Sequence, residues 1–154
     1  MAAQASDSPR VRVAALILLD GKIVLVRHQA RGHRYHLLPG GGVEFGETLE
    51  TALAREVRQE TGLLVDVGRP LFLSDTIDPN GRRHIVNITF SAERVGGAVT
   101  ATPEDRRIEA VDLVSPESLA QLDLRPPMAD AIVRAVRSDL ASAEYLGPLF
   151  TPEK

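Results

Sequence analysis

The chain contains no cysteine and no tryptophan, and aromatic residues make up only 4% of its 154 residues. Without cysteine it can form no disulfide bond, no thiol nucleophile and no cysteine metal site. Long hydrophobic stretches are also missing: the longest, Val13–Leu19, has the length of a strand, whereas a membrane helix needs about 18 apolar residues. Met1–Pro9 lacks the basic and apolar regions of a signal peptide. These absences favour a cytoplasmic protein without a membrane partner.

The chain also lacks a strong excess of either charge, with 18 Lys and Arg against 21 Asp and Glu, a net charge of −3. Binders of nucleic-acid polymers usually carry a basic surface, so we expect no such partner. A small phosphorylated compound needs only a few local arginines and a metal ion. Length and composition are typical of one globular domain, which we place at residues 11–145 between a disordered lead-in (1–10) and a C-terminal tail (146–154). A homodimer stays an open alternative.

Strand-like and helix-like segments are mixed along the chain. Apolar and β-branched runs predict strands at Val11–Leu19, Lys22–Arg27, Leu63–Val67, Pro70–Thr76, His84–Glu93 and Ile108–Val114. Asp20-Gly21 predicts a two-residue hairpin turn, and the polar segment His28–His36 predicts a surface loop. Helical patterns cover Glu47–Thr61 and Pro126–Ala143, with a short helical turn at Ser115–Glu117. Together these elements predict an α/β sandwich with a mixed sheet.

The first predicted helix carries two acidic residues on its apolar side. At about 100° per residue, Leu49 and Leu53 lie in one apolar stripe, and Glu56 and Glu60 lie in the middle of it, about 40° apart. A solvated acidic face would not be centred on leucines, and unpaired carboxylates against a core are costly. A divalent cation with oxygen ligands would neutralise both, whereas an arginine, Arg55 or one from elsewhere, is the alternative partner.

Three consecutive glycines, Gly40-Gly41-Gly42, precede this helix. A main chain without side chains can approach a phosphate or a metal ion closely, although glycines alone also fit a simple turn. Mg²⁺ prefers carboxylates together with phosphate oxygens of the substrate. The glycine loop and the acidic helix together therefore predict metal-dependent phosphate chemistry.

The spacing of these residues resembles the Nudix box. Gly41 is followed by five residues, Glu47, seven residues and the segment Arg55–Leu63, which reads REVRQETGL. The only departure within the box is Gln59, where the family has a glutamate. The resemblance implies a Nudix-like α/β/α sandwich with a mixed sheet. It also implies an enzyme that uses water to split a diphosphate bond in a nucleoside triphosphate, ADP-ribose, a nucleotide sugar or a dinucleotide.

The resemblance further implies roles for the matched residues. Glu56 and Glu60 would be the principal Mg²⁺ or Mn²⁺ ligands, with a main-chain carbonyl of Gly40 or Gly41. Arg55 would orient a catalytic glutamate by a charge-assisted bond, which makes Arg55, Glu56 and Glu60 the catalytic set. Glu47 would stabilise the junction of loop and helix and reach the metal through water.

Many family members use a further acidic residue from a late loop as general base or extra metal ligand. The candidates are Glu104, Asp105 and Glu109, each of which is otherwise a solvated surface residue. Because Gln59 lacks a charge, an additional metal ion should bind less tightly. Gln59 also leaves open a nucleotide-binding sensor that does not cleave its ligand, although the retained catalytic set favours the enzyme.

Candidates for substrate binding lie beside the glycine loop or carry suitable side chains. They are Gly40, Gly41, Arg27, Arg34, Tyr35 and His84. The arginines would meet phosphates or only solubilise a loop, and the histidine is otherwise a surface residue. For stacking on a base, the aromatic candidates are Tyr35, Phe45 and Phe90. The position of Pro79 resembles that in ADP-ribose hydrolysing members, although Asp78–Gly81 also fits a turn.

Overall fold

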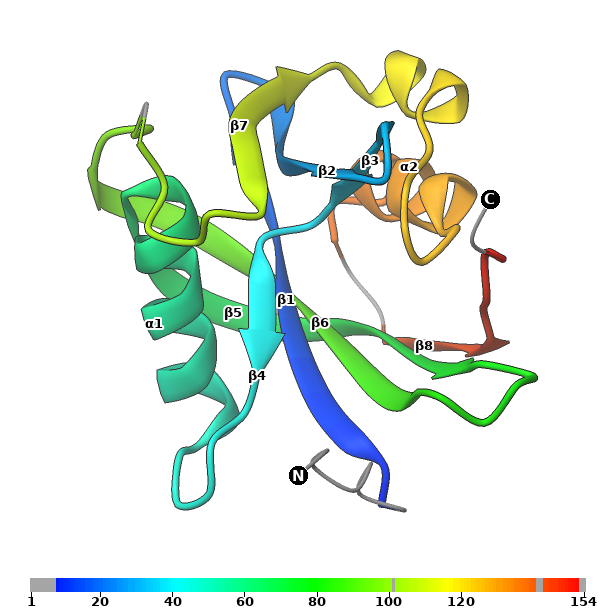
Figure 1. Ribbon diagram of the computed structural model, residues 1–154. Coiled ribbons are helices and arrows are strands. Elements are labelled where there is room, and N and C mark those ends of the chain that lie inside the picture. The colour runs from blue at the N-terminus through cyan, green and yellow to red at the C-terminus, as the bar shows by residue number, and fades with distance from the viewer. Residues whose placement is uncertain (1–7, 101, 141–142, 153–154) are drawn as a thin grey trace.

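The computed structural model describes residues 8–100, 102–140 and 143–152 (Figure 1). Its strands form a mixed sheet with the order β3-β2-β1-β6-β5-β8, in which β4 also pairs with β1 and β7 with β2. The elements are β1 (Arg10–Leu19), β2 (Lys22–Ala30), β3 (His33–Leu37), β4 (Gly40–Gly42), α1 (Leu49–Thr61), β5 (Leu63–Ile77), β6 (His84–Gly97), β7 (Ile108–Val114), the 3-10 helix η1 (Pro116–Gln121), α2 (Ala129–Arg137) and β8 (Glu144–Pro148). In the described part of the chain, no helix has the length and apolar character needed to cross a membrane.

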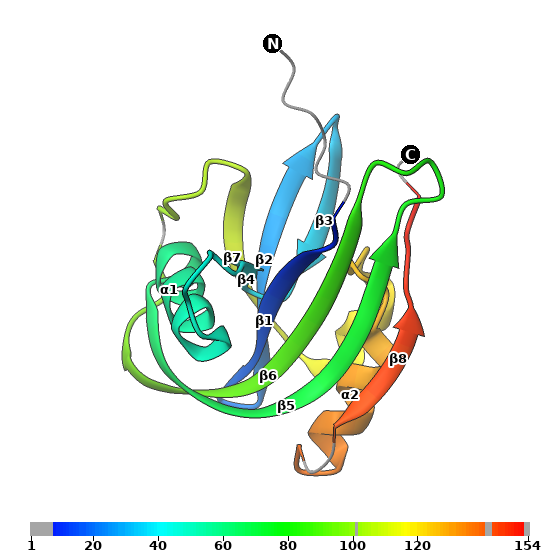
Figure 2. The same cartoon turned by 90° about the horizontal axis from the view of Figure 1, so that it is seen from below.

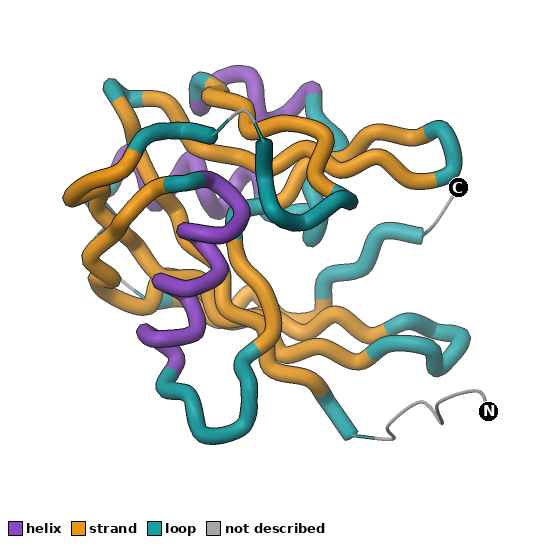
Figure 3. Tube along the Cα trace, turned by 60° about the vertical axis from the view of Figure 1, so that its left-hand side comes forward, coloured by secondary structure: helices purple, strands orange, loops and turns teal. Residues whose placement is uncertain are grey.

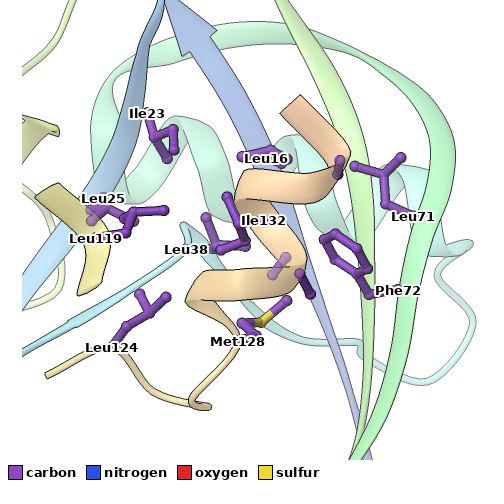
Figure 4. Packing of buried hydrophobic residues seen from close by; sticks show 13 residues of the cluster. Leu16, Ile23, Leu25, Leu38, Leu71, Phe72, Leu119, Leu124, Met128 and Ile132 are labelled. Atoms are coloured by element: carbon purple, nitrogen blue, oxygen red, sulfur yellow. The ribbon is translucent and has the colours of Figure 1, made fainter. Parts of the chain in front are cut away.

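The sheet is covered by a helix on each face, as Figure 2 shows for α1 and α2 on opposite sides of β1, β6 and β5. Because successive side chains of a strand point to opposite faces, the whole run Val13–Ile17 of β1 is buried. Val13 packs with Leu53 of α1, whereas Leu16 packs with Ile132 of α2 in the cluster drawn in Figure 4. The predicted α/β/α sandwich with a mixed sheet is confirmed.

Helix α1 begins and ends with conventional caps. The side chain of Thr48 accepts a hydrogen bond from the Thr51 amide (3.1 Å), so the helix begins two residues later than predicted from Glu47. It ends at Gly62, whose φ of 81° is left-handed and whose added Cβ would lie 2.5 Å from the Ala98 carbonyl oxygen. The predicted end of this helix at Thr61 is confirmed.

The segment predicted as a surface loop, His28–His36, is instead largely a hairpin. β2 continues to Ala30 and pairs with β3, and the turn between them is Arg31-Gly32, both with positive φ. The loop prediction was wrong because both strands carry polar side chains, which conceal the two-residue period by which strands are identified.

One continuous strand, β5, takes the place of two predicted strands. Leu63–Val67 and Pro70–Thr76 both belong to β5, whose register against β6 shifts between Val67 and Pro70 and again between Pro70 and Phe72. Irregularities of this kind let a strand continue past Gly68 and a proline that would otherwise end it.

The C-terminal region differs from the prediction in two ways. α2 ends at Arg137, well before Ala143, because Asp139 and Leu140 adopt left-handed φ values of 58° and 57°. The expected tail begins inside β8, which pairs in parallel with β5 at the edge of the sheet. At the other end, β1 already begins at Arg10, and residues 1–7 of the expected lead-in lie outside the described residues.

We predict that Leu53→Ala lowers the free energy of unfolding by about 2–5 kcal/mol, because it leaves a cavity between α1 and the sheet. Leu53 is fully buried in the α1 cluster. Urea unfolding at neutral pH measures the change. Arg58→Ala, on the exposed side of the same helix, is the control and should stay within about 0.5 kcal/mol of wild type. A loss for Leu53→Ala as small as for Arg58→Ala would contradict this packing.

Candidate active site

The glycine loop lies directly against the acidic residues of α1. β4 pairs with β1, and the amide of Gly40 donates to Glu60 Oε1 at 2.6 Å. A Cβ on Gly40 would lie 2.0 Å from the Val13 carbonyl oxygen, and one on Gly41 would lie 2.4 Å from Glu56 Cδ. Only glycine permits this approach of the main chain, so the loop and both glutamates form one site.

Glu60 is a buried carboxyl group, with 5% of the residue exposed. Burial raises the pKa of Glu60 to about 7. The hydrogen bond from the Gly40 amide and the positive charge of Arg12 act in the opposite direction and lower this pKa. The nearby charges of Glu56 and Asp105 raise this pKa further. More positive charge is therefore needed beside Glu60 to keep it ionised at neutral pH.

Arg55 connects three parts of the site. Its Nε and Nη2 donate to the two carboxylate oxygens of Glu47 at 2.9 and 2.8 Å, and its Nη1 donates to Glu56 Oε1 at 2.7 Å. Nη2 also donates to the Gly42 carbonyl at 3.2 Å. The bond from Arg55, and secondarily that from the Glu44 amide, lowers the pKa of Glu47 to about 2. Arg55 thus fixes the loop to the helix and holds one oxygen of Glu56.

The sequence allows two partners for the acidic pair, an arginine and a divalent cation, and the geometry of the site is relevant to both. Arg55 donates a hydrogen bond to Glu56. Glu60 instead accepts a hydrogen bond from the Gly40 amide and interacts electrostatically with Arg12. Among the described residues, no group of three or more His, Asp or Glu side chains is arranged to hold a metal ion. The oxygen ligands that the site offers are the carboxylates of Glu56 and Glu60 beside the glycine loop, and oxygen ligands of this kind fit a hard cation such as Mg²⁺.

A cavity of about 470 Å³ opens beside the glycine loop, which is large enough for a small-molecule ligand. Glu60 is the one acidic residue among the described residues that line it. The basic residues of the lining are Arg10, Arg12, Arg31, Arg83, Arg107 and Arg125, with His28 and His33. Such a lining favours an anionic ligand of high charge.

The residues predicted to bind substrate are divided between this cavity and the surface. Gly40, Gly41 and Tyr35 line the cavity. Arg27 and Arg34 do not, and both form ion pairs with Glu109, at 3.1 and 2.8 Å. The first residue of β6, His84, is exposed and also lies outside the lining.

The late-loop acids have different surroundings. Asp105 pairs with Arg107 at 2.7 Å, which lowers the pKa of Asp105, and its charge acts on Glu60. Glu104 is exposed, and its amide donates to the carbonyl of Gln59 at 3.2 Å. Glu109 is paired with Arg27 and Arg34. Of the three late-loop acids, Asp105 is therefore the one whose charge acts on Glu60.

Several cavity residues were missed by the sequence analysis. Arg10 and Arg12 alternate on β1, so their two-residue spacing could have placed both on one face of a strand. His28 is buried, which lowers its pKa, and it lies in the β2–β3 hairpin, where the sequence predicts a loop. No sequence signal marks Phe150, which enters the cavity only because β8 joins the sheet.

Comparison with known proteins gives consistent matches. A family model described as NUDIX domain matches residues 8–135. The chain is 35% identical over 113 residues to an ADP-ribose pyrophosphatase of Methanocaldococcus jannaschii, covering 73% of this chain and 67% of that protein. It is 28% identical to the phosphatase NudJ of Escherichia coli, over 84% of each chain. A NUDIX hydrolase structure from Nitrosomonas europaea has the same fold, with a TM-score of 0.74 at 24% identity over 86% of this chain and 90% of that one.

We predict that Glu47→Gln destabilises the protein at neutral pH and that its difference from wild type shrinks as the pH falls from about 5 to about 2. The pKa of Glu47 is lowered from 4.5 to about 2 on folding, so the pair with Arg55 stabilises the protein above the unfolded pKa and is lost as the pH falls through the folded one. Urea unfolding across this range, in EDTA, measures the difference. Glu44→Gln, an exposed neighbour, is the control. A difference that is independent of pH would refute the ion pair.

Proposed function

The chain belongs to the NUDIX family and is a hydrolase, and from this we propose that it splits the diphosphate bond of a nucleoside-diphosphate compound with water and Mg²⁺ or Mn²⁺. One observation carries the proposal: Glu56 and Glu60 both lie against the glycine loop, and Glu60 and this loop line a cavity together with six arginines. Carboxylates attract a divalent cation, and arginines attract phosphates. A diphosphate-bearing ligand satisfies both.

The arginines of the site have different roles in binding the substrate. Arg12 lies close enough to Glu60 for their charges to interact, and Arg10 lines the same cavity, so both can neutralise oxygens of the diphosphate. Arg55 keeps Glu56 in place through its bonds to Glu56 and Glu47. The substrate is thereby oriented against a rigid helix, which is a large part of what phosphoryl transfer requires.

The metal would be held by Glu56, Glu60 and a main-chain carbonyl of Gly40 or Gly41, with Glu47 acting through water. When bound, it supplies a polarised phosphoryl oxygen and a more acidic water. In the reaction a water oxygen forms a bond to phosphorus, the bridging P–O bond breaks, and the proton of water passes to a carboxylate. We retain Asp105 as the candidate for an extra ligand or general base, because its charge acts on Glu60.

The relatives narrow the substrate class. One is an ADP-ribose pyrophosphatase, so ADP-ribose and related nucleotide-linked diphosphates are the first compounds to test. Gln59 leaves one negative charge fewer than the family pattern, and we propose that it reduces the number of tightly bound ions. A cytoplasmic location and a homodimer stay predictions from the sequence.

The test is a hydrolysis screen of the full chain with Mg²⁺ and ATP, ADP-ribose, a UDP-sugar and a dinucleoside polyphosphate. We expect turnover of at least one compound, and a loss in kcat/KM of at least about a hundredfold for Glu56→Gln and for Glu60→Gln, the scale of a missing electrostatic group. Glu50→Gln, an exposed glutamate in the first turn of the same helix, is the matched control and should keep its activity.

Thermal unfolding of each variant separates loss of activity from loss of folding. If the wild-type protein turns over none of these compounds but still binds nucleotides, the nucleotide-binding sensor that does not cleave its ligand would be favoured. Full activity in folded Glu56→Gln and Glu60→Gln would show that the carboxylates are not the metal ligands.

A further inference from the structure

The chain has six aromatic residues, all within the described part, so the surroundings of each are known. Phe72 and Phe90 are buried in the two cores, at 2% and 6% exposure. Phe45 is fully exposed in the loop before α1, and Tyr145 is exposed on β8. Neither of these two lines the cavity. The aromatic residues of the cavity are therefore Tyr35 and Phe150.

Tyr35 is already packed against other groups of the protein. The guanidinium carbon of Arg125 lies 4.3 Å from the centre of the Tyr35 ring, which is a cation–π contact. The ring of His28 lies 5.3 Å from it on a tilted plane. Tyr35 is therefore already in contact with Arg125 and His28, and neither of these contacts involves Phe150.

Phe150 is positioned by β8 and by the residue that precedes it. β8 pairs in parallel with β5, with Pro148 opposite Asp75, and the Leu149 amide then donates to the Asp75 carbonyl at 2.6 Å. The Tyr145 hydroxyl donates to the side chain of Asp75. Figures 2 and 3 show the chain after β8 running on the same side of the molecule as the turns β2–β3 and β5–β6. Asp75 therefore anchors the segment that carries Phe150 into the cavity.

The cavity combines an acidic residue and the glycine loop with apolar side chains. Glu60 and the glycine loop come from α1 and β4, which is the side where the diphosphate would bind. Apolar side chains also line the cavity, among them Ile85 of β6 and Leu149 and Phe150 after β8, together with Val11, Ala30, Leu37 and Pro126 from other parts of the chain. A ligand with an anionic part and a flat apolar part would match both.

We infer that Phe150 stacks on the nucleobase of the substrate, so that the segment after β8 forms the base-binding wall of the active site. The inference rests on the proposed function for the choice of a nucleotide as ligand. Base–aromatic stacking tolerates any base, because every base has a π-face. Phe150 thus selects for a nucleoside over a base-free phosphate and discriminates weakly among bases.

The test is calorimetric binding of AMP and of ribose 5-phosphate to the full chain in EDTA, which needs no turnover. For Phe150→Ala we expect AMP to bind about tenfold more weakly, on the scale of one lost base–aromatic stack, and ribose 5-phosphate to bind unchanged. Phe150→Tyr should restore AMP binding. Phe45→Ala is the matched control, since Phe45 is exposed outside the cavity, and should bind both compounds like wild type.

Three results would overturn the inference: wild type that does not bind AMP, Phe150→Ala that binds AMP like wild type, or equal weakening of both compounds. Thermal unfolding of the variants excludes a general loss of structure. Because binding is measured without hydrolysis, a wild type that turns over no compound would refute the proposed function while the AMP measurement still decides the role of Phe150. With an active enzyme, Phe150→Ala should raise KM for ADP-ribose more than it lowers kcat.

Discussion

The hydrogen bond from the Gly40 amide to the buried carboxylate of Glu60 is the contact on which the site depends. It joins the first residue of β4 to the last turn of α1, and it holds a carboxyl group in a place that solvent hardly reaches. A buried carboxylate with so few donors is stable only beside further positive charge. Arg12 supplies part of that charge, which is why a strand residue of β1 belongs to the same unit as the loop and the helix.

How much of this could be predicted depends on how local each signal is. The helical wheel placed Glu60 on the buried side of α1, and the spacing of glycines and glutamates identified the family, because both patterns lie within one short segment. β7 was predicted with its observed bounds for the same reason. The electrostatic interaction of Arg12 with Glu60 and the parallel pairing of β8 depend on residues far apart in the sequence, and no local pattern encodes them.

The overall charge of the chain conceals its local field. The net charge of the chain is −3, yet the cavity collects six arginines around one acidic residue in its described lining. The arginine and metal partners that the sequence offered as alternatives are also compatible, since Arg55 holds Glu56 from the side of Glu47. Folding, rather than composition, brings these charges together, so a chain with a small net negative charge can still hold a highly charged small ligand.

The two parts of the site stand on elements with different places in the fold, and this bears on how substrate preference can change. Glu56 and Glu60 lie on α1, whose Leu53 and Val57 are fully buried against the sheet, so their positions are fixed by the core. Phe150 lies beyond β8, a short strand that, in the described part of the chain, pairs with β5 at the edge of the sheet. Substitutions around β8 can therefore alter which group is held beside the diphosphate without disturbing the carboxylates, because the core that fixes the chemistry lies elsewhere in the fold.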